Sequence, residues 1–361
     1  MGPRTLLFLG AGASTPFDYP TTEQFKSRLQ QALGDDSANN RLLKDILSRE
    51  RIKDIEDVLS SLDQVCELES LPLALSFLTD IWHTEIRAKE LALVPNKDLI
   101  PYAKAIREIV RDAVFTYYQP KPESDSDIRT LYNRVLEALF RFTANQTNQK
   151  TWETKGKAVV VTTNYDPVIE RFCGPFGLKL RDGFEGNPTT ERGNWNPTWS
   201  FSDFSHDAVY LLKLHGSLNW RKQRVTNEIV RVPVSERVPR QSGEYLDNAL
   251  LYPGSKGVPT EEPFKTLFAT FEKLLKDAYT CVVLGYRFRD DNINAHLLRF
   301  LQDDRKALFV LSPHSEGNVR ENLRAPSELM GKRILTKPDE FSLTSTGLVK
   351  FLENARSRSE T

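Results

Sequence analysis

Cysteine is scarce in this chain of 361 residues, which holds only Cys66, Cys173 and Cys281. No two of them are close enough in the sequence to form a Cys-x-x-Cys pair. Structural zinc sites are usually built from such pairs, so the sequence argues against a thiolate zinc site. An odd and sparse count also argues against a disulfide framework and is typical of a reducing cytoplasm.

Long apolar runs are missing as well. Near the start of the chain the unbroken apolar run extends only from Leu6 to Leu9, whereas a signal peptide needs about 7 apolar residues or more. No stretch approaches the roughly 20 apolar residues of a membrane-spanning helix. We therefore expect a cytoplasmic protein without a membrane partner.

Neither sign of charge is in excess, because 49 Lys and Arg residues balance 49 Asp and Glu residues. A general nucleic-acid binder carries a basic surplus, so we expect no direct nucleic-acid partner. Hydrophobic residues make up 39% of the chain. Together with the zero net charge, this fraction is typical of a folded globular protein and not of a disordered one.

Five short runs of aliphatic and β-branched residues predict strands that are buried on both faces, as in a parallel sheet. They are residues 5–9, 158–162, 209–214, 280–284 and 307–311. Helical patterns alternate with the later strands, at 261–278, 290–303, 315–324 and 339–355. The alternation predicts an α/β fold with a doubly wound, Rossmann-like and mostly parallel sheet.

The segment between the first two strands has a different pattern, with helical stretches only. These stretches are roughly 21–33, 39–50, 54–69, 71–93, 98–118 and 127–149. We therefore predict an α/β domain made of residues 1–20 and 151–361, interrupted by an all-helical insertion at 21–150. Within the α/β domain, 181–207 is predicted to be a long loop or an irregular subdomain, and 221–256 to form short strands with turns.

Small residues follow the first strand as Gly10-Ala11-Gly12-Ala13-Ser14. Glycine has no Cβ and lets the backbone approach a phosphate closely. A dehydrogenase fingerprint needs a helix directly after the glycines and an acid at the end of a second strand about 20 residues on. Neither is found, so the segment predicts a phosphate-binding loop or a tight turn, and not hydride transfer.

Polar side chains follow the next two strands. Thr163, Asn164 and Asp166 follow the strand at 158–162, and His215 follows the third strand. Ligands of open α/β sheets bind outside the carboxyl ends of the strands, so these residues are candidates for one crevice. His215 is a candidate base or a structural histidine. Asn164 and Asp166 are candidates for the crevice or for capping the following helix.

Two further strand exits complete the pattern, with the residues Gly285, Tyr286, Arg287 and Ser312. Gly285 permits a second close backbone approach, and Arg287 or Arg289 offers a positive charge to a diphosphate. Asp290 is equally suited to be the N-cap of the next helix. Five such exits at one edge of a sheet indicate a nucleotide crevice.

In this order, Gly-Ala-Gly-Ala-Ser, Thr-Thr-Asn-Tyr-Asp, Leu-His-Gly-Ser and Leu-Gly-Tyr-x-x-x-Asp resemble the NAD site of the sirtuin fold, in particular the bacterial sirtuin-like branch of anti-phage defence. The likeness covers 5–20 and about 155–315. It implies NAD as substrate, Asn164 positioning the ribose or a water, and His215 as the base. It also implies NAD contacts from Gly10, Ala11, Gly12, Ala13, Ser14, Thr163, Asp166, Gly285, Tyr286 and Ser312. At Arg287 the chain departs from the family, which usually has Ser there, and the contact with NAD is expected from the positive charge of the side chain.

The chain departs from the protein deacylases of that fold. It lacks their four-cysteine zinc module, and it has Asp18-Tyr-Pro-Thr-Thr-Glu23 where they have Gly-Ile-Pro-Asp-Phe-Arg. The resemblance therefore implies NAD hydrolysis to nicotinamide and ADP-ribose, without zinc. Protein deacylation or ADP-ribosyl transfer, and a non-catalytic NAD or ADP-ribose sensor, stay open as alternatives.

An uncontrolled NADase would deplete its own cell, so we expect its activity to be gated. We expect this control to act through a homo-oligomer and a partner that senses infection, and the resemblance suggests a HerA-type ATPase as one such partner. The helical segment 21–149 is the surface that we expect to serve this control.

Overall fold

The computed structural model describes residues 5–48, 52, 54, 55, 57–59, 62, 99–119, 142–144, 152–154, 158–173, 179–199, 208–234, 236, 241–251 and 259–338. The chain divides into two compact units. The first comprises Met1–Pro20, Tyr118–Leu251 and Gly257–Thr361, and the second comprises Thr21–Tyr117 and Tyr252–Lys256. Each unit is described by itself below.

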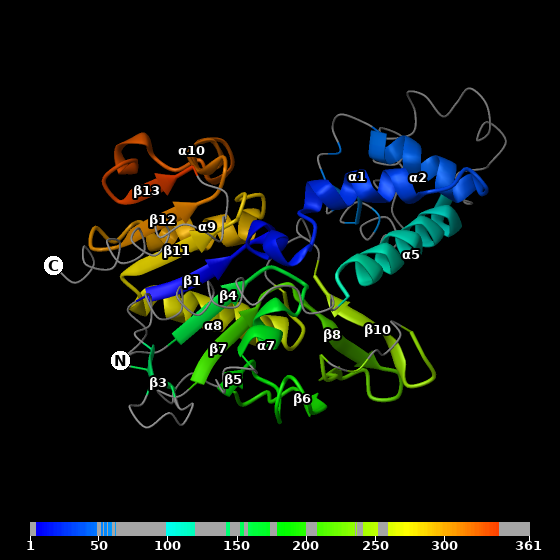
Figure 1. The fold of residues 1–361 in the computed structure, drawn as a ribbon, viewed down its shortest axis with the longest axis horizontal. Helices are drawn as coiled ribbons and strands as arrows, with labels where there is room; N and C mark the ends of the chain where they lie inside the picture. The colour runs from blue at the N-terminus through cyan, green and yellow to red at the C-terminus, as the bar shows by residue number, and fades with distance from the viewer. Residues whose placement is uncertain are drawn as a thin grey trace. The chain divides into compact units, whose positions relative to one another are not determined.

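A seven-stranded sheet forms the centre of the first unit, with the strand order β13-β12-β11-β1-β4-β7-β5 (Figure 1). Each pair of neighbouring strands is parallel. The strands are β1 (Thr5–Leu9), β4 (Ala158–Thr162), β5 (Lys179–Arg181), β7 (Ala208–Lys213), β11 (Thr280–Leu284), β12 (Ala307–Leu311) and β13 (Ile334–Lys337). The predicted α/β class with a mostly parallel, Rossmann-like sheet is confirmed.

The apolar runs of the sequence become the buried strands of this sheet. Every residue of β1, β4 and β11 is buried, as is usual where a parallel sheet is covered on both faces. Helix α8 (Phe264–Asp277) lies against the sheet, and its Phe271 ring is 5.9 Å from that of Phe8. The buried face of α8 has helical spacing and consists of Phe264, Leu267, Phe268, Phe271, Leu274 and Leu275.

The winding of the sheet reverses beside β1. The chain runs from β1 to β4, forms the edge strand β5 and then β7 between β4 and β5, and it later returns to β11 on the other side of β1 and continues to β12 and β13. The register keeps the carboxyl ends level, because Leu9 pairs with both Leu284 and Thr162, and Thr162 pairs with Lys213. Open α/β sheets bind ligands at such a reversal, outside the carboxyl ends.

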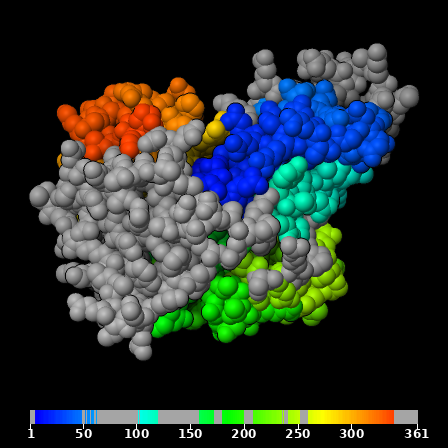
Figure 2. Space-filling view, viewed as in Figure 1, coloured from blue at the N-terminus to red at the C-terminus, as the bar shows by residue number. Residues whose placement is uncertain are grey.

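Shorter elements follow several of these strands. A 3-10 helix, η1 (Ala11–Phe17), follows β1, and α7 (Val168–Cys173) follows β4. Helix α9 (Asp291–Phe300) lies between β11 and β12. The helix expected at 315–324 is α10 (Ser315–Asn318) continued by a π-helical turn at Val319–Leu323, with a 3-10 turn at Ser327–Leu329 before β13. The orange and red atoms of this last segment gather at one corner of the space-filling view (Figure 2).

A second sheet has the order β10-β8-β9-β6 and is antiparallel. Its strands are β6 (Gly193–Asn194), β8 (Gly216–Gln223), β9 (Ile229–Arg231) and β10 (Tyr245–Leu250). The short strands expected at 221–256 are confirmed. The described part of 181–207 resembles the irregular subdomain more than a long loop, because it contains the end of β5, all of β6 and a bridge between Phe184 and Trp195.

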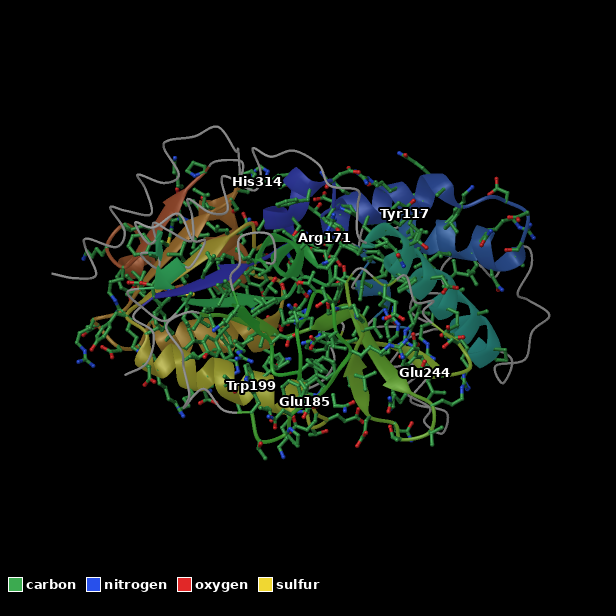
Figure 3. The ribbon with its side chains drawn as sticks, turned by 60° about the horizontal axis from the view of Figure 1, so that its bottom comes forward. Tyr117, Arg171, Glu185, Trp199, Glu244 and His314 are labelled. Carbon is green, nitrogen blue, oxygen red and sulfur yellow. The ribbon has the colours of Figure 1, made fainter. Side chains whose placement is uncertain are left out.

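A buried ion pair holds this loop against β9. The Arg231 guanidinium donates to Asp182 at 2.6 Å and to the carbonyl of Glu185 at 2.7 Å, and both charged side chains are buried. Aromatic rings pack beside it, with Trp195 5.9 Å from Trp199. Figure 3 labels Glu185 and Trp199 in this segment. This segment, whose sequence shows no periodic pattern, is therefore held in place by contacts between side chains that are far apart in the sequence.

The second unit contains α1 (Thr22–Ala32), α2 (Ala38–Ser48) and α5 (Leu99–Tyr117). Helix α1 begins with a capping box, because Thr21 and Gln24 each accept from the other's backbone N–H. The compact helical unit ends at Tyr117, earlier than the boundary expected at 150. No helix in the described part of the chain is long and apolar enough to span a membrane.

The helix expected at 127–149 is wrong at residues 142–144. There the backbone forms β2 (Phe142–Ala144), which pairs antiparallel with β3 (Trp152–Thr154). The insertion is therefore not all-helical up to residue 150. The helices expected at 71–93 and 339–355 lie outside the described residues.

Candidate active site

The exits of β1 and β11 are in direct backbone contact. The amide of Gly10 donates to the carbonyl of Leu284, and that of Gly12 to the carbonyl of Gly285, both at 2.9 Å. A Cβ on Gly10 would lie 2.6 Å from the Cα of Tyr286. At Gly285, whose φ is +61°, a Cβ would lie 2.4 Å from the amide nitrogen of Ala13. This contact requires glycines whether or not a ligand binds.

The two glycine amides are thus used within the protein and are not directed to a phosphate. Of the two predictions for this segment, a phosphate-binding loop and a tight turn, the contact with Gly285 favours the turn at Gly10 and Gly12. Gly10 and Gly12 still lie where the strand order reverses, so the Ala11–Ser14 backbone lies at the carboxyl edge of the sheet. The contacts of these residues with NAD stay a prediction.

Asn164 joins the second motif to the first. Its side-chain amide nitrogen donates to the carbonyl of Gly10 at 2.9 Å and to the Ser14 hydroxyl at 3.0 Å. Its own backbone N–H donates to the Thr162 hydroxyl. The side chain is almost fully buried, and two hydrogen bonds fix its amide group. Asn164 therefore acts across the sheet edge and does not cap α7.

Asp166 is the residue that caps α7, since its Oδ1 accepts from the backbone N–H of Val168 at 3.1 Å. The other oxygen, Oδ2, is buried and makes no hydrogen bond with any described residue. It belongs to a small cavity of about 10 Å³, near the lower limit for one water molecule. Both interpretations of Asp166, as cap and as crevice residue, are therefore compatible with its position.

A buried lysine that the sequence analysis did not single out lies in the same cavity. The Lys213 ammonium donates to the backbone carbonyl of Asp166 at 2.6 Å and to Glu170 at 2.9 Å. The side chains of Lys213 and Glu170 are 1% and 2% exposed. Lys213 thus ties the end of β7 to the turn that carries Asn164 and Asp166. The only local signal is a charged residue that directly ends a buried strand.

Burial raises the pKa of the Asp166 carboxyl, and the positive charge of Lys213 opposes this without cancelling it. A carboxylate with a raised pKa destabilises the fold when it is ionised. The penalty is present above the folded-state pKa and disappears below the ordinary value of 3.8. The ionised Asp166 side chain therefore lowers the stability of the fold, which is common for functional residues.

We predict that Asp166→Asn raises the free energy of unfolding at neutral pH by on the order of 1 kcal/mol. Asparagine keeps the oxygen that caps α7 but carries no charge to bury. Urea denaturation of both proteins at pH 7 and at pH 3.5 measures the difference, which should vanish at the lower pH. Asp277→Asn, in an exposed part of α8, is the control. A variant less stable than wild type at pH 7 would contradict the prediction.

His215 follows β7 and contacts a residue from the fourth motif. Its ring Nε2 lies 2.8 Å from Oδ2 of Asp290, and both side chains are buried. The other ring nitrogen, Nδ1, makes no hydrogen bond with any described residue. Asp290 also caps α9 by accepting from the N–H groups of Asn292 and Ile293. The predicted cap is confirmed, and the contact with His215 is an addition to it.

The second and third motifs are held together through Tyr165. The amide of Leu218 donates to the Tyr165 carbonyl at 3.0 Å, and the amide of Leu214 donates to the carbonyl of Thr162. The Tyr165 hydroxyl donates to Leu251, and its ring centroid is 6.5 Å from that of His215. The structure therefore brings Asn164 and His215 to one edge of the sheet.

The β12 exit contributes buried hydroxyls. The side-chain oxygens of Ser312 and Ser315 are buried without a hydrogen bond to any described residue. The Gly285 amide donates to the carbonyl of Leu311, which joins this exit to that of β11. The Arg287 carbonyl accepts from Asn322. Whether Tyr286, Arg287 and Ser312 contact NAD stays a prediction.

A comparison with protein-family models gives one match. Residues 158–336 match the model described as a SIR2-like domain. Over these residues the chain is similar to the SIR2-like family. The match spans just under half of the chain and includes the exits of β4, β7, β11 and β12. The matched segment thus contains Asn164, Asp166, His215 and Asp290, while Gly10–Ser14 precede it.

Solved structures give a weaker likeness. A Sir2 homologue in complex with NAD is 13% identical with a TM-score of 0.42, and the alignment covers 99% of this chain and 90% of that one. A mutant Sir2 homologue in complex with ADP-ribose is also 13% identical, with a TM-score of 0.41 and coverages of 99% and 92%. These values are too low to transfer the role of a residue. No curated protein matches the chain.

Metal ligands are not clustered in the described part of the chain, where no group of three or more His, Cys, Asp and Glu side chains is arranged to hold an ion. Cys281 is buried, which raises the pKa of its thiol to about 12 and makes it a poor ligand at neutral pH. That the protein works without zinc stays a prediction from the sequence.

Proposed function

We propose that the SIR2-like domain hydrolyses NAD at the nicotinamide–ribose bond and releases nicotinamide, ADP-ribose and a proton. The observation that carries this proposal is the convergence of a buried amide, Asn164, and a buried imidazole, His215, at the carboxyl edge of the sheet. One ring nitrogen of His215 makes no bond within the described residues. It can therefore accept a proton from a ribose hydroxyl or a water.

The chemistry of the bond suits these neutral polar groups. Nicotinamide leaves the ribose as a neutral molecule, so its departure needs no strong general acid. The positive charge that develops on the ribose needs a rigidly held sugar and oriented dipoles nearby. Asn164 is suited to this task, because Gly10 and Ser14 fix its amide in one orientation.

A biological role follows from the resemblance of the motifs. We propose that the enzyme depletes NAD during anti-phage defence, in the manner of abortive infection. Because constant activity would harm the cell, we propose that a homo-oligomer, and a partner such as a HerA-type ATPase, regulate it. The SIR2-like match supports the NAD chemistry. The need for regulation comes from the physiological argument, and the kind of partner comes from the resemblance of the motifs.

One assay separates this proposal from its alternatives. Purified protein is fractionated by size, the mass of each fraction is measured by light scattering, and each fraction is incubated with NAD while free nicotinamide is measured. We expect turnover without added peptide, greatest in an oligomeric fraction. Turnover only with an acylated peptide would indicate a deacylase, and tight binding without turnover a sensor. Constitutive activity of a strict monomer would contradict the proposed gating.

A further inference from the structure

The loop that carries Asp290 from β11 to α9 has a fixed and unusual backbone. Besides Gly285, the buried residue Phe288 has a positive φ of 57°, which is uncommon for a bulky side chain. Two side-chain amides hold this conformation. Asn294 donates to the carbonyl of Phe288 and Asn322 to that of Arg287, both at 2.8 Å. The position of Asp290 is therefore determined by the surrounding structure.

Asp290 uses its two oxygens for two purposes. Oδ1 accepts from the N–H groups of Asn292 and Ile293, at 2.8 and 3.3 Å, which is all that an N-cap requires. Oδ2 is turned to Nε2 of His215 at 2.8 Å. Burial raises the pKa of the Asp290 carboxyl, but the hydrogen bond from His215 and the two cap hydrogen bonds hold it below its usual range.

We propose that Asp290 is a positioning residue that keeps the proton of neutral His215 on Nε2 and the lone pair on Nδ1. An ionised carboxylate can only accept hydrogen bonds, so Nε2 must be the donor in this contact. The atom left to accept a proton is Nδ1, which is buried and makes no hydrogen bond with a described residue. The catalytic part of this inference rests on the proposed function.

The proton balance of the step is simple. A water molecule or a ribose hydroxyl gives its proton to Nδ1, while Nε2 keeps its own. The imidazole becomes an imidazolium ion next to the Asp290 carboxylate, which stabilises the new charge and stays ionised. Asp290 therefore sets the orientation of the base and does not itself exchange a proton.

Asp290→Asn separates this role from capping. Asparagine is as good an N-cap as aspartate, so we expect α9 and the melting temperature to be unchanged. Its NH2 group would instead face Nε2, which would make Nε2 the acceptor and move the proton of His215 to Nδ1. We expect kcat for nicotinamide release to fall by about 10²- to 10⁴-fold, with KM for NAD little changed. Asp291→Asn, one residue away and exposed, removes the same charge and should leave kcat unchanged.

The tautomer is measured independently of activity by 15N NMR of histidine-labelled protein, with His215 assigned from the His215→Gln spectrum. We expect protonated Nε2 in wild type and protonated Nδ1 in Asp290→Asn. Wild-type kcat and an unchanged tautomer in the variant would overturn the positioning role. If wild type releases no nicotinamide, the proposed function fails while the tautomer result still decides the role of Asp290. If the variant melts early, Asp290→Ser, which retains a capping oxygen but no carboxylate to face Nε2, takes its place in the kinetic measurement, and the same loss of kcat is expected.

Discussion

Substitution of His215 by alanine or by glutamine is expected to lower kcat for nicotinamide release from NAD by about 10²- to 10⁴-fold, the usual contribution of a general base. Alanine also leaves the buried carboxylate of Asp290 without its partner. Glutamine is the cleaner variant, because its amide can still donate to Asp290 but cannot accept a proton. Initial rates at saturating NAD measure the effect.

His314→Ala is the matched control, since this histidine is exposed at the start of α10, forms no side-chain cap hydrogen bond and is labelled in Figure 3. Its kcat should equal that of wild type. Asn164→Ala should resemble His215→Gln, because it removes the amide that orients the ribose or a water. If ADP-ribose formation continued at the wild-type rate in His215→Gln, His215 would not be the base.

Lys213→Met is expected to lower the free energy of unfolding by about 3–5 kcal/mol, as is usual when one partner of a buried ion pair is removed. Glu170 would stay in the protein interior as an uncompensated carboxylate. The turn with Asn164 would also lose the hydrogen bond that the ammonium donates to the Asp166 carbonyl. Urea denaturation at pH 7 measures the change.

A double variant separates the loss of the pair from the loss of packing. In Lys213→Met with Glu170→Leu no buried charge of this pair is left, and much of the lost stability should return. Lys276→Met is the control, because Lys276 pairs with Glu272 at the surface of α8 and its side chain is 68% exposed. That substitution should cost no more than about 0.5 kcal/mol. Equal effects of Lys213→Met and Lys276→Met would refute the argument.

The sequence was sufficient to predict the five central strands and their common edge. Strands buried on both faces are continuous apolar runs, and the carboxyl ends of parallel strands must meet at one edge. The sequence does not reveal the edge strands β5 and β13, because both are short and two of the three residues of β5, a lysine and an arginine, are exposed. Edge strands of this kind carry little of the pattern that identifies a core strand.

The sequence is sufficient to predict which strand ends form the site, but not which of their side chains contact one another. His215 and Asp290 are 75 residues apart in the sequence, and Lys213 and Glu170 are 43 apart. No local periodicity relates residues so far apart. The left-handed backbone of Phe288 was equally hidden, since an apolar aromatic residue is among the last expected there.

The hydrogen bond between Gly12 and Gly285 prepares the backbone for ligand binding. It fastens the two halves of the sheet to each other at the point where the winding reverses. Because this hydrogen bond already fixes the backbone at the exits of β1 and β11, the backbone there loses little conformational entropy when a nucleotide binds. More of the intrinsic interaction energy is then available as affinity. Discrimination among nucleotides then depends on side chains around a preorganised frame and not on a backbone that adapts to each of them.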